Sequence, residues 1–203
     1  MGSLAELLAR ADELASTGRR RILGITGPPG AGKSTLADRI VHGLGTDRAV
    51  LVGMDGFHLA NAELARIGLS DRKGAPETFD RDGYVALLAR LRQPTGTVYA
   101  PAFDRRLEES IAAAVAVPPE LPLVVTEGNY LLHWPEVRPL LDEVWYLDPD
   151  PADRLAALIA RHVAFGKSAE QAKDWVLRSD ERNARLIARD RELADRRLDW
   201  GTW

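Results

Sequence analysis

The fold of this chain is decided by the stretch Gly27-Pro28-Pro29-Gly30-Ala31-Gly32-Lys33-Ser34-Thr35. Its first eight residues match the pattern G-x-x-x-x-G-K-[ST] in full. The glycines let the backbone turn tightly and point its N–H groups at phosphate oxygens, at a helix N-terminus whose dipole favours anions. Lys33 offers a positive charge to the β- and γ-phosphates, and Ser34 offers a hydroxyl to Mg²⁺. The stretch therefore predicts a site for a nucleoside triphosphate rather than a plain glycine turn.

Short apolar runs on both sides of this loop predict the strands of a sheet. They cover residues 21–27, 49–54, 123–126 and 144–147, and the pattern turns helical between them, as at 33–44. Continuous apolar strands separated by helices are typical of a parallel sheet with helices on both faces, so an α/β fold is expected. Ligands of such sheets bind beyond the carboxyl ends of the strands. The residues expected at those ends are the phosphate loop, Asp55, Glu127 and Asp148.

Two segments outside the sheet are assigned from their composition. Residues 4–15 repeat apolar side chains at helical spacing, which predicts an amphipathic helix. The region of about 57–120 is irregular and holds several Gly and Pro residues. It is expected to form a cap over the strand ends, with one helix at 84–91.

The C-terminal part is rich in charge. Residues 152–166 and 168–196 are predicted to be helices. In the second helix an acid precedes a base by four residues, a spacing that stabilises exposed helices, in the pairs Asp174/Arg178, Glu181/Arg185 and Glu192/Arg196. These charges are interpreted as a solvated face, and Trp200 and Trp203 are expected to pack on the domain. Since there is no repeat or linker, residues 1–203 are predicted to be a single domain.

Composition narrows the class of protein. Lys and Arg number 27 and Asp and Glu number 30, so the net charge is −3 and there is no basic excess for binding nucleic acid. The absence of cysteine excludes disulfides and thiolate chemistry. No uncharged stretch approaches the ~18–20 residues of a membrane span, and the N-terminus lacks a secretory pattern. A cytoplasmic protein without nucleic-acid or membrane partners is expected, and a homodimer is left open.

Two acids stand where strands are expected to end beside the phosphate loop. Asp55 could accept a proton from an attacking hydroxyl or hold a metal ion, and the alternative is a helix cap. Glu127 stands where a carboxylate of the Walker B type would orient Mg²⁺, and the alternative is an acid on a surface loop. The candidate metal ligands, directly or through water, are therefore Ser34, Glu127 and Asp55.

A pair of arginines on the predicted helix 152–166 forms a candidate lid. Arg154 and Arg161 are seven residues apart and so share one face, and His162 follows them. Arginines on a hinged segment could close over the phosphates and offset charge as the phosphoryl group moves. The alternative is an ordinary charged surface, which the spacing alone does not exclude.

The order of the short motifs resembles one group of kinases, over about residues 20–200. After the phosphate loop come Asp55-Gly56-Phe57-His58, Pro76-Glu77-Thr78-Phe79-Asp80, Pro101-Ala102-Phe103-Asp104, Glu127-Gly128, Arg161-His162 with Gly166, and Ser179-Asp180-Glu181 with Asn183. This order is similar to that of uridine kinase, phosphoribulokinase and type I pantothenate kinase, and most of all to bacterial nucleoside/nucleotide kinase proteins.

The resemblance implies a P-loop kinase fold with a five-stranded parallel sheet, a small cap and a helical lid at about 152–168. It implies ATP with Mg²⁺ as the phosphoryl donor and a small hydroxyl compound as the acceptor. Lys33, Asp55 and Arg161 are then the candidate catalytic residues. The candidate acceptor-binding residues are His58, Phe79, Asp80, Phe103, Arg106, Asn129 and Tyr130.

The sequence departs from uridine kinase at positions that contact its acceptor or form its lid. His58 replaces a tyrosine, Arg105-Arg106-Leu107-Glu108 stands where uridine kinase has His and Arg, and Ala157 replaces a lid arginine. The acceptor therefore stays open among a nucleoside, a pantothenate-like acid and a sugar.

Two other functions are kept as alternatives. In a nucleoside monophosphate kinase, the phosphate of the acceptor could be held by Arg66, Arg72, Lys73 and Arg81. A nucleotide-dependent switch with little catalysis is the other, although the Asn-Lys-x-Asp string that reads guanine is absent. His42 and His133 lack partners at metal-ligand spacing and are expected to be structural.

Overall fold

A computed structural model describes residues 3–164, 166 and 168–199. Its centre is a five-stranded sheet in the order β2 (Ala49–Leu51), β5 (Leu123–Glu127), β1 (Arg21–Thr26), β6 (Glu143–Asp148) and β7 (Arg196–Asp199). Every neighbouring pair is parallel. The predicted five-stranded parallel sheet is therefore confirmed.

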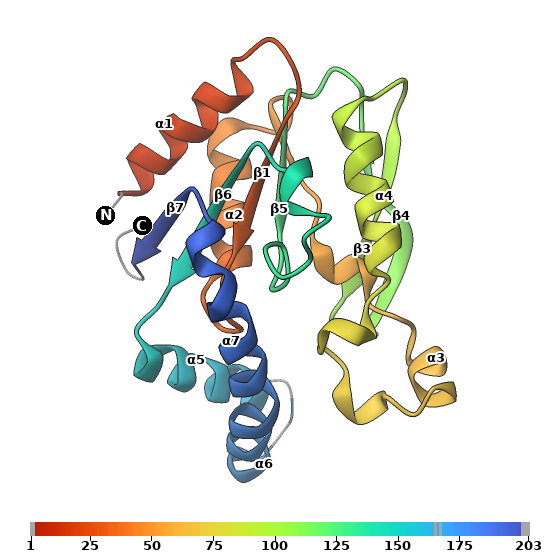
Figure 1. Cartoon of the computed structure of the whole chain (residues 1–203), viewed down its shortest axis with the longest axis vertical. Coiled ribbons are helices and arrows are strands. Elements are labelled where there is room, and N and C mark those ends of the chain that lie inside the picture. The colour runs from red at the N-terminus through yellow and green to blue at the C-terminus, as the bar shows by residue number, and fades with distance from the viewer. Residues whose placement is uncertain (1–2, 165, 167, 200–203) are drawn as a thin grey trace.

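Alternate residues of the central strands face two separate cores. On β1, Leu23 and Ile25 pack with α1 (Leu4–Ala15) and α2 (Lys33–Leu44). Ile22 points the other way, into a core that contains α4 (Arg81–Arg92) and the segment after β5. Figure 1 shows α1 and α4 on opposite sides of the sheet. Continuous apolar strands are required here because both faces of the sheet are covered.

The cap at residues 57–120 contains more regular structure than its sequence predicted. The helix expected at 84–91 is α4, and a short helix α3 (Asn61–Arg66) precedes it. An antiparallel hairpin of β3 (Val98–Asp104) and β4 (Glu109–Val117) completes the cap. Most of β4 is solvent-exposed, so it has no clear apolar alternation that would have revealed it. Gly56 allows the close approach of residues 54–57 to β3, because a Cβ there would lie 2.6 Å from the Pro101 carbonyl oxygen.

The predicted helix at 168–196 is wrong as a single element. It is divided into α6 (Ala169–Trp175), a π-helical turn (Val176–Asp180), α7 (Glu181–Ile187) and a 3₁₀ segment (Ala188–Leu193), after α5 (Pro151–Ala164). The helical segment ends at Leu193, before the predicted end at residue 196, and Arg196 instead begins β7, which gains ladder hydrogen bonds with β6 and buries Leu198. Trp200 and Trp203 lie outside the described residues.

The charged pairs predicted for this segment form only in part. Asp174 and Arg178 make the expected ion pair, at 2.7 Å. Glu181 instead pairs with Arg154 of α5, and Glu192 pairs with Arg191 and Arg197. Among the described residues, no helix is long and apolar enough to cross a membrane.

Glu143 connects α1 and β7 to strand β6 of the sheet through hydrogen bonds and ion pairs. This buried carboxylate accepts hydrogen bonds from Arg10 Nε of α1 at 2.9 Å and from Trp145 Nε1 at 2.8 Å, and it lies 3.0 Å from Arg196 Nε of β7. One buried acid thus satisfies donors from three elements.

We expect Glu143→Gln to lower the free energy of unfolding by about 1–3 kcal/mol, because an amide cannot accept from all three donors, and because it leaves Arg196 without a counter-charge and Arg10 with Glu13 alone. Urea denaturation measures the change. Asp38→Asn, at an exposed position with the same loss of charge, is the control. Equal stability of the two variants would contradict this role.

Candidate active site

The phosphate loop joins β1 to α2, as predicted. Gly27, Gly30 and Gly32 have positive φ angles of 147°, 82° and 83°. These conformations are favourable only for glycine, and they turn the chain directly into the N-terminus of α2. A Cβ on Gly27 would lie 2.6 Å from the carbonyl oxygen of Leu147. The local sequence therefore fixes the loop shape that anions need at a helix start.

Lys33 is buried beneath the loop. Its Nζ donates hydrogen bonds to the carbonyl oxygens of Gly27 and Pro28, both at 3.0 Å. Burial lowers the pKa of this ammonium, and the carboxylates of Glu127 and Asp55 oppose that shift. The charge is thus held in place before any phosphate arrives.

The two predicted carboxylates lie together near Lys33. Glu127 ends β5 and is 8% exposed, and Asp55 follows the neighbouring strand β2. Burial raises the pKa of Glu127, and the charge of Asp55 raises it further. A hydrogen bond from the Ser34 hydroxyl partly compensates. These contacts remove the two alternatives from the sequence: Glu127 is not a surface acid, and Asp55 makes no side-chain cap to its helix.

The oxygen atoms of Ser34, Asp55 and Glu127 fit a magnesium ion by their chemistry. They are the hard donors that Mg²⁺ prefers, and two adjacent carboxylates gain from a cation between them. Within the described part of the chain no group of three or more His, Cys, Asp or Glu residues could hold a metal by itself. An ion here would need phosphate oxygens and water as further ligands, which is the usual mode of Mg²⁺ binding.

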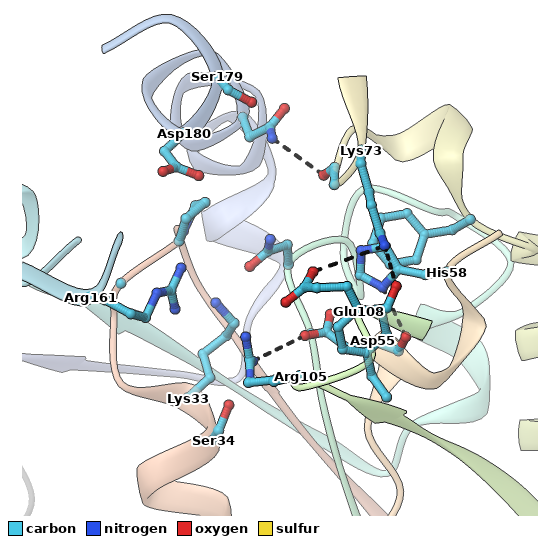
Figure 2. A pocket seen from close by; sticks show the side chains of 18 of the residues that line it. Lys33, Ser34, Asp55, His58, Lys73, Arg105, Glu108, Arg161, Ser179 and Asp180 are labelled. Atoms are coloured by element: carbon cyan, nitrogen blue, oxygen red, sulfur yellow. Dashed lines mark hydrogen bonds and ion pairs between the residues drawn. The ribbon is translucent and has the colours of Figure 1, made fainter. Parts of the chain in front are cut away.

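A cavity of about 470 Å³ extends from the phosphate loop toward the cap (Figure 2). Its volume lies in the range of small-molecule sites. It brings together most of the residues predicted from the sequence, which are Pro29, Gly30, Lys33, Ser34, Asp55, His58, Phe79, Phe103, Glu127, Asn129, Arg161 and His162. Loop residues Gly27, Pro28, Ala31, Gly32 and Thr35 do not line it.

The cap end of the cavity is aromatic. The ring of His58 lies 4.0 Å from that of Phe79 and 4.8 Å from that of Phe103, measured between centroids. His58 Nδ1 donates to the backbone carbonyl oxygen of Asp55 at 2.8 Å, and burial lowers the pKa of the imidazole. The His58 ring is therefore neutral and fixed in orientation, and it contacts Phe79 and Phe103 while it is hydrogen-bonded to the backbone of Asp55, the candidate base.

Several polar residues of the cavity were not in the predicted set. Arg105 Nη2 lies 3.5 Å from Asp55 Oδ2, so this guanidinium faces the carboxylate (Figure 2). Lys73 Nζ lies 5.2 Å from the centre of the Phe103 ring and 4.0 Å from Glu108 Oε2. The sequence offered Lys73 only as a contact for the phosphate of an alternative acceptor, and Arg105 only as one of two adjacent arginines, and it does not say which of these side chains turn inward.

Four predicted site residues outside the phosphate loop do not line the cavity either. Arg106 is wrongly chosen over its neighbour Arg105, because it points to solvent, 91% exposed, beside Asp104. Asp80 caps α4 by accepting from Gly83 N at 2.9 Å. Tyr130 is buried and donates to the Gly74 carbonyl oxygen at 2.6 Å. Arg154 is buried in an ion pair with Glu181 and also donates to Pro29 O at 3.3 Å, so it braces the lid helix against the phosphate loop.

The lid helix α5 directs two residues at the cavity. Arg161 points toward Lys33 in Figure 2, and burial lowers the pKa of its guanidinium, as does nearby Arg105. His162 Nε2 lies 3.0 Å from Asp180 Oδ2. Asp180 belongs to the π-helical turn, an irregularity that is frequent at functional sites. The lid is therefore held by the segment α6–α7.

Several known proteins are similar to this chain in sequence and in structure. A family model described as "Phosphoribulokinase / Uridine kinase family" matches residues 22–199. A Schizosaccharomyces pombe protein named "Putative uridine kinase" is 30% identical over 210 residues, which cover 96% of this chain and 89% of that protein. An Aspergillus versicolor "ATP-dependent kinase-like protein" is 33% identical over 166 residues, which cover 74% of this chain and 95% of that protein.

A solved structure matches over the same extent. The crystal structure of a "putative fructose transport system kinase" from Silicibacter sp. TM1040 superposes with a TM-score of 0.88 at 35% identity. The match covers 98% of this chain and 100% of that one. It therefore includes the sheet, the cap and the lid segments together.

The raised pKa of Glu127 predicts a pH effect on the nucleotide-free protein. Its pKa rises from 4.5 to about 7 on folding, so the folded state keeps a proton that the unfolded state releases. Deprotonation of this carboxyl therefore lowers the free energy of unfolding as the pH rises through that interval. We expect Glu127→Gln to gain stability relative to the wild type as the pH increases from 4.5 to about 7 in chemical denaturation.

The control is again Asp38→Asn, whose difference from the wild type should not follow the same curve. A Glu127→Gln difference that stays constant with pH would mean that this carboxyl is not held in a costly environment.

Proposed function

The chain belongs to the phosphoribulokinase / uridine kinase family of ATP-using P-loop kinases, which phosphorylate hydroxyl groups, and we propose that it acts on a small metabolite with Mg–ATP as the donor. One observation supports this proposal: the phosphate loop, two carboxylates and an aromatic pocket line the same cavity, which we call the reaction cavity. A donor phosphate at one end and an acceptor hydroxyl at the other would meet beside Asp55.

The proposed step is an in-line transfer. The acceptor oxygen forms a bond to the γ-phosphorus while the bond from that phosphorus to the β,γ-bridging oxygen breaks, and its electron pair leaves with ADP. The hydroxyl proton passes to the Asp55 carboxylate. Such a reaction needs mainly positioning and charge stabilisation, and few reactive side chains.

Each charged side chain has a separate task in this scheme. Lys33 neutralises the β- and γ-phosphate oxygens, and Ser34 and Glu127 would hold the magnesium ion. When bound, that ion would offset the charge of the phosphate oxygens. Arg161 reaches the moving phosphoryl group from α5. Arg105, which faces Asp55, keeps this carboxylate turned into the cavity.

The acceptor end favours a compound with a flat or apolar face and polar edges. His58, Phe79 and Phe103 supply aromatic surface, while Asn129 and Lys73 supply hydrogen-bonding groups. This combination is compatible with the three acceptor classes left open by the sequence: a nucleoside, a pantothenate-like acid or a sugar.

The arginines considered above as ligands for an acceptor phosphate are engaged elsewhere. Arg66 pairs with Glu63, Arg72 with Glu77 and Arg81 with Asp82, and none of the three lines the reaction cavity. Lys73 alone of that set does. This arrangement supports a hydroxyl acceptor over a nucleoside monophosphate. A nucleotide-dependent switch needs no aromatic pocket beside its phosphate loop, so this pocket favours a kinase over that alternative.

We expect Asp55→Asn to lower kcat by about 10²–10⁴-fold, because the hydroxyl loses its proton acceptor. ADP release is measured with a panel of nucleosides, hydroxy acids and sugars, and Asp38→Asn serves as the control. Nucleotide affinity, measured by calorimetry, should change little. The proposal fails if no acceptor stimulates ADP release in the wild type, or if Asp55→Asn keeps the full rate.

Phe103→Ala should raise the KM for the acceptor roughly tenfold or more, through lost contact with the bound face, and leave the KM for ATP unchanged. Tyr99→Ala is a matched control because Tyr99 lies on the same strand but is 58% exposed. A parallel rise in both KM values would place Phe103 in general stability rather than in acceptor binding.

A further inference from the structure

A second cavity, of about 560 Å³, adjoins the reaction cavity. Trp175, Ser179 and Asn183 line both. The second cavity otherwise lies between residues 71–77 of the cap and one side of α7. We call it the arginine groove, because its charged lining residues are Arg72, Arg178, Arg182, Arg185, Arg189, Asp71 and Glu77.

Three of these arginines make no ion pair within the described part of the chain, and Asp71 is the acid of the groove that is likewise not in an ion pair there. Arg72 is paired with Glu77, and Arg178 with Asp174. Within residues 3–164, 166 and 168–199, no hydrogen bond or ion pair engages the guanidinium groups of Arg182, Arg185 and Arg189. Arg182 and Arg185 lie one turn apart on α7, and Arg189 follows in the 3₁₀ segment Ala188–Leu193; all three are solvent-exposed. Like charges at this spacing repel each other, and the groove keeps them without compensation.

The acids nearest in sequence are all directed away from the groove. Asp180 faces His162 at 3.0 Å, Glu181 pairs with Arg154 and Asp190 faces His133 at 3.2 Å. The expected Glu181/Arg185 pair is therefore replaced by a contact inside the lid. The positive charge of the groove results from this arrangement of the acids, and it persists in a chain whose net charge is −3.

We infer that the arginine groove binds a small molecule carrying phosphate groups. Guanidinium groups bind phosphate through paired hydrogen bonds, and several on one face select ligands of more than one negative charge. The volume of the groove, about 560 Å³, fits a small metabolite. The site differs from the phosphate loop, with which it shares no lining residue.

A ligand in this groove would contact the cap and α7 at once. Residues 71–77 also include Lys73 and Gly74, which line the reaction cavity. Asn183 Nδ2 already donates to the Gly74 carbonyl oxygen across this boundary, at 3.3 Å. Occupancy of the groove would strengthen the same connection, so the bound molecule acts as an effector that stabilises the cap against the lid segment. The binding itself does not depend on the proposed phosphoryl transfer.

The test uses the full chain with its phosphate loop saturated by the Mg²⁺ complex of a non-hydrolysable ATP analogue. Inorganic phosphate is the probe, titrated calorimetrically at constant ionic strength. We expect saturable binding, and the triple variant R182Q/R185Q/R189Q should weaken it about tenfold or more, because three charged hydrogen-bond donors are lost. Phosphate should also raise the Tm of the wild type more than that of the variant.

The matched control is R19Q/R39Q/R90Q, which removes the same charge from exposed arginines outside the groove and should bind phosphate like the wild type. If the triple variant is unstable, R185Q alone should give a smaller loss in the same direction. The inference is overturned if phosphate does not bind saturably, or if R182Q/R185Q/R189Q and R19Q/R39Q/R90Q lose affinity for phosphate equally. It is also overturned if a hydroxyl compound displaces phosphate equally well from R182Q/R185Q/R189Q and from the wild type.

Discussion

The burial of Lys33 and Glu127 at one edge of the sheet is the constraint on which the rest of this structure depends. Neither charge is stable in an apolar interior alone. The ammonium is held by two carbonyl oxygens of the phosphate loop, and the carboxylate is held by Ser34 and lies in the field of Lys33. Both positions require the parallel pairing of β1 with β5 and glycines at φ angles that other residues avoid. The site proposed for phosphate and magnesium follows from these charges, which the protein alone balances incompletely.

The cap and the lid are fixed by contacts with this edge and with each other. Asp55 is placed by the end of β2, and its backbone carbonyl orients His58. On the other side, Arg154 reaches back to Pro29 of the phosphate loop. The carbonyl oxygen of Gly74 accepts from both Tyr130 and Asn183, so the core after β5 and the helix α7 hold the same cap segment. The reaction cavity and the arginine groove therefore adjoin each other at this contact between the cap and α7.

Sequence reasoning succeeded where function depends on local backbone and strand position. The phosphate loop, Asp55 and Glu127 lie where the motif and the apolar runs predicted them, because a glycine-rich turn is a local structure and parallel strands end at one edge. It failed for Arg106, Asp80 and Tyr130, since a short motif does not show which neighbour turns inward. The hairpin β3–β4 was missed because residues 111–117 are all apolar although most of β4 is exposed, so they show no alternation of apolar and polar side chains.

The sequence by itself determined the fold class, the phosphate loop and the two acids beside it. The tertiary structure alone decided which cations face a ligand. Glu181 could pair with Arg185 one turn along the helix or with Arg154 on another helix, and local spacing favours the first. The buried guanidinium of Arg154 makes the second necessary, since an unpaired charge in the interior is far more costly than an unpaired arginine at the surface. That choice leaves Arg185 without an ion pair among the described residues, and no pattern read along the chain could have shown it.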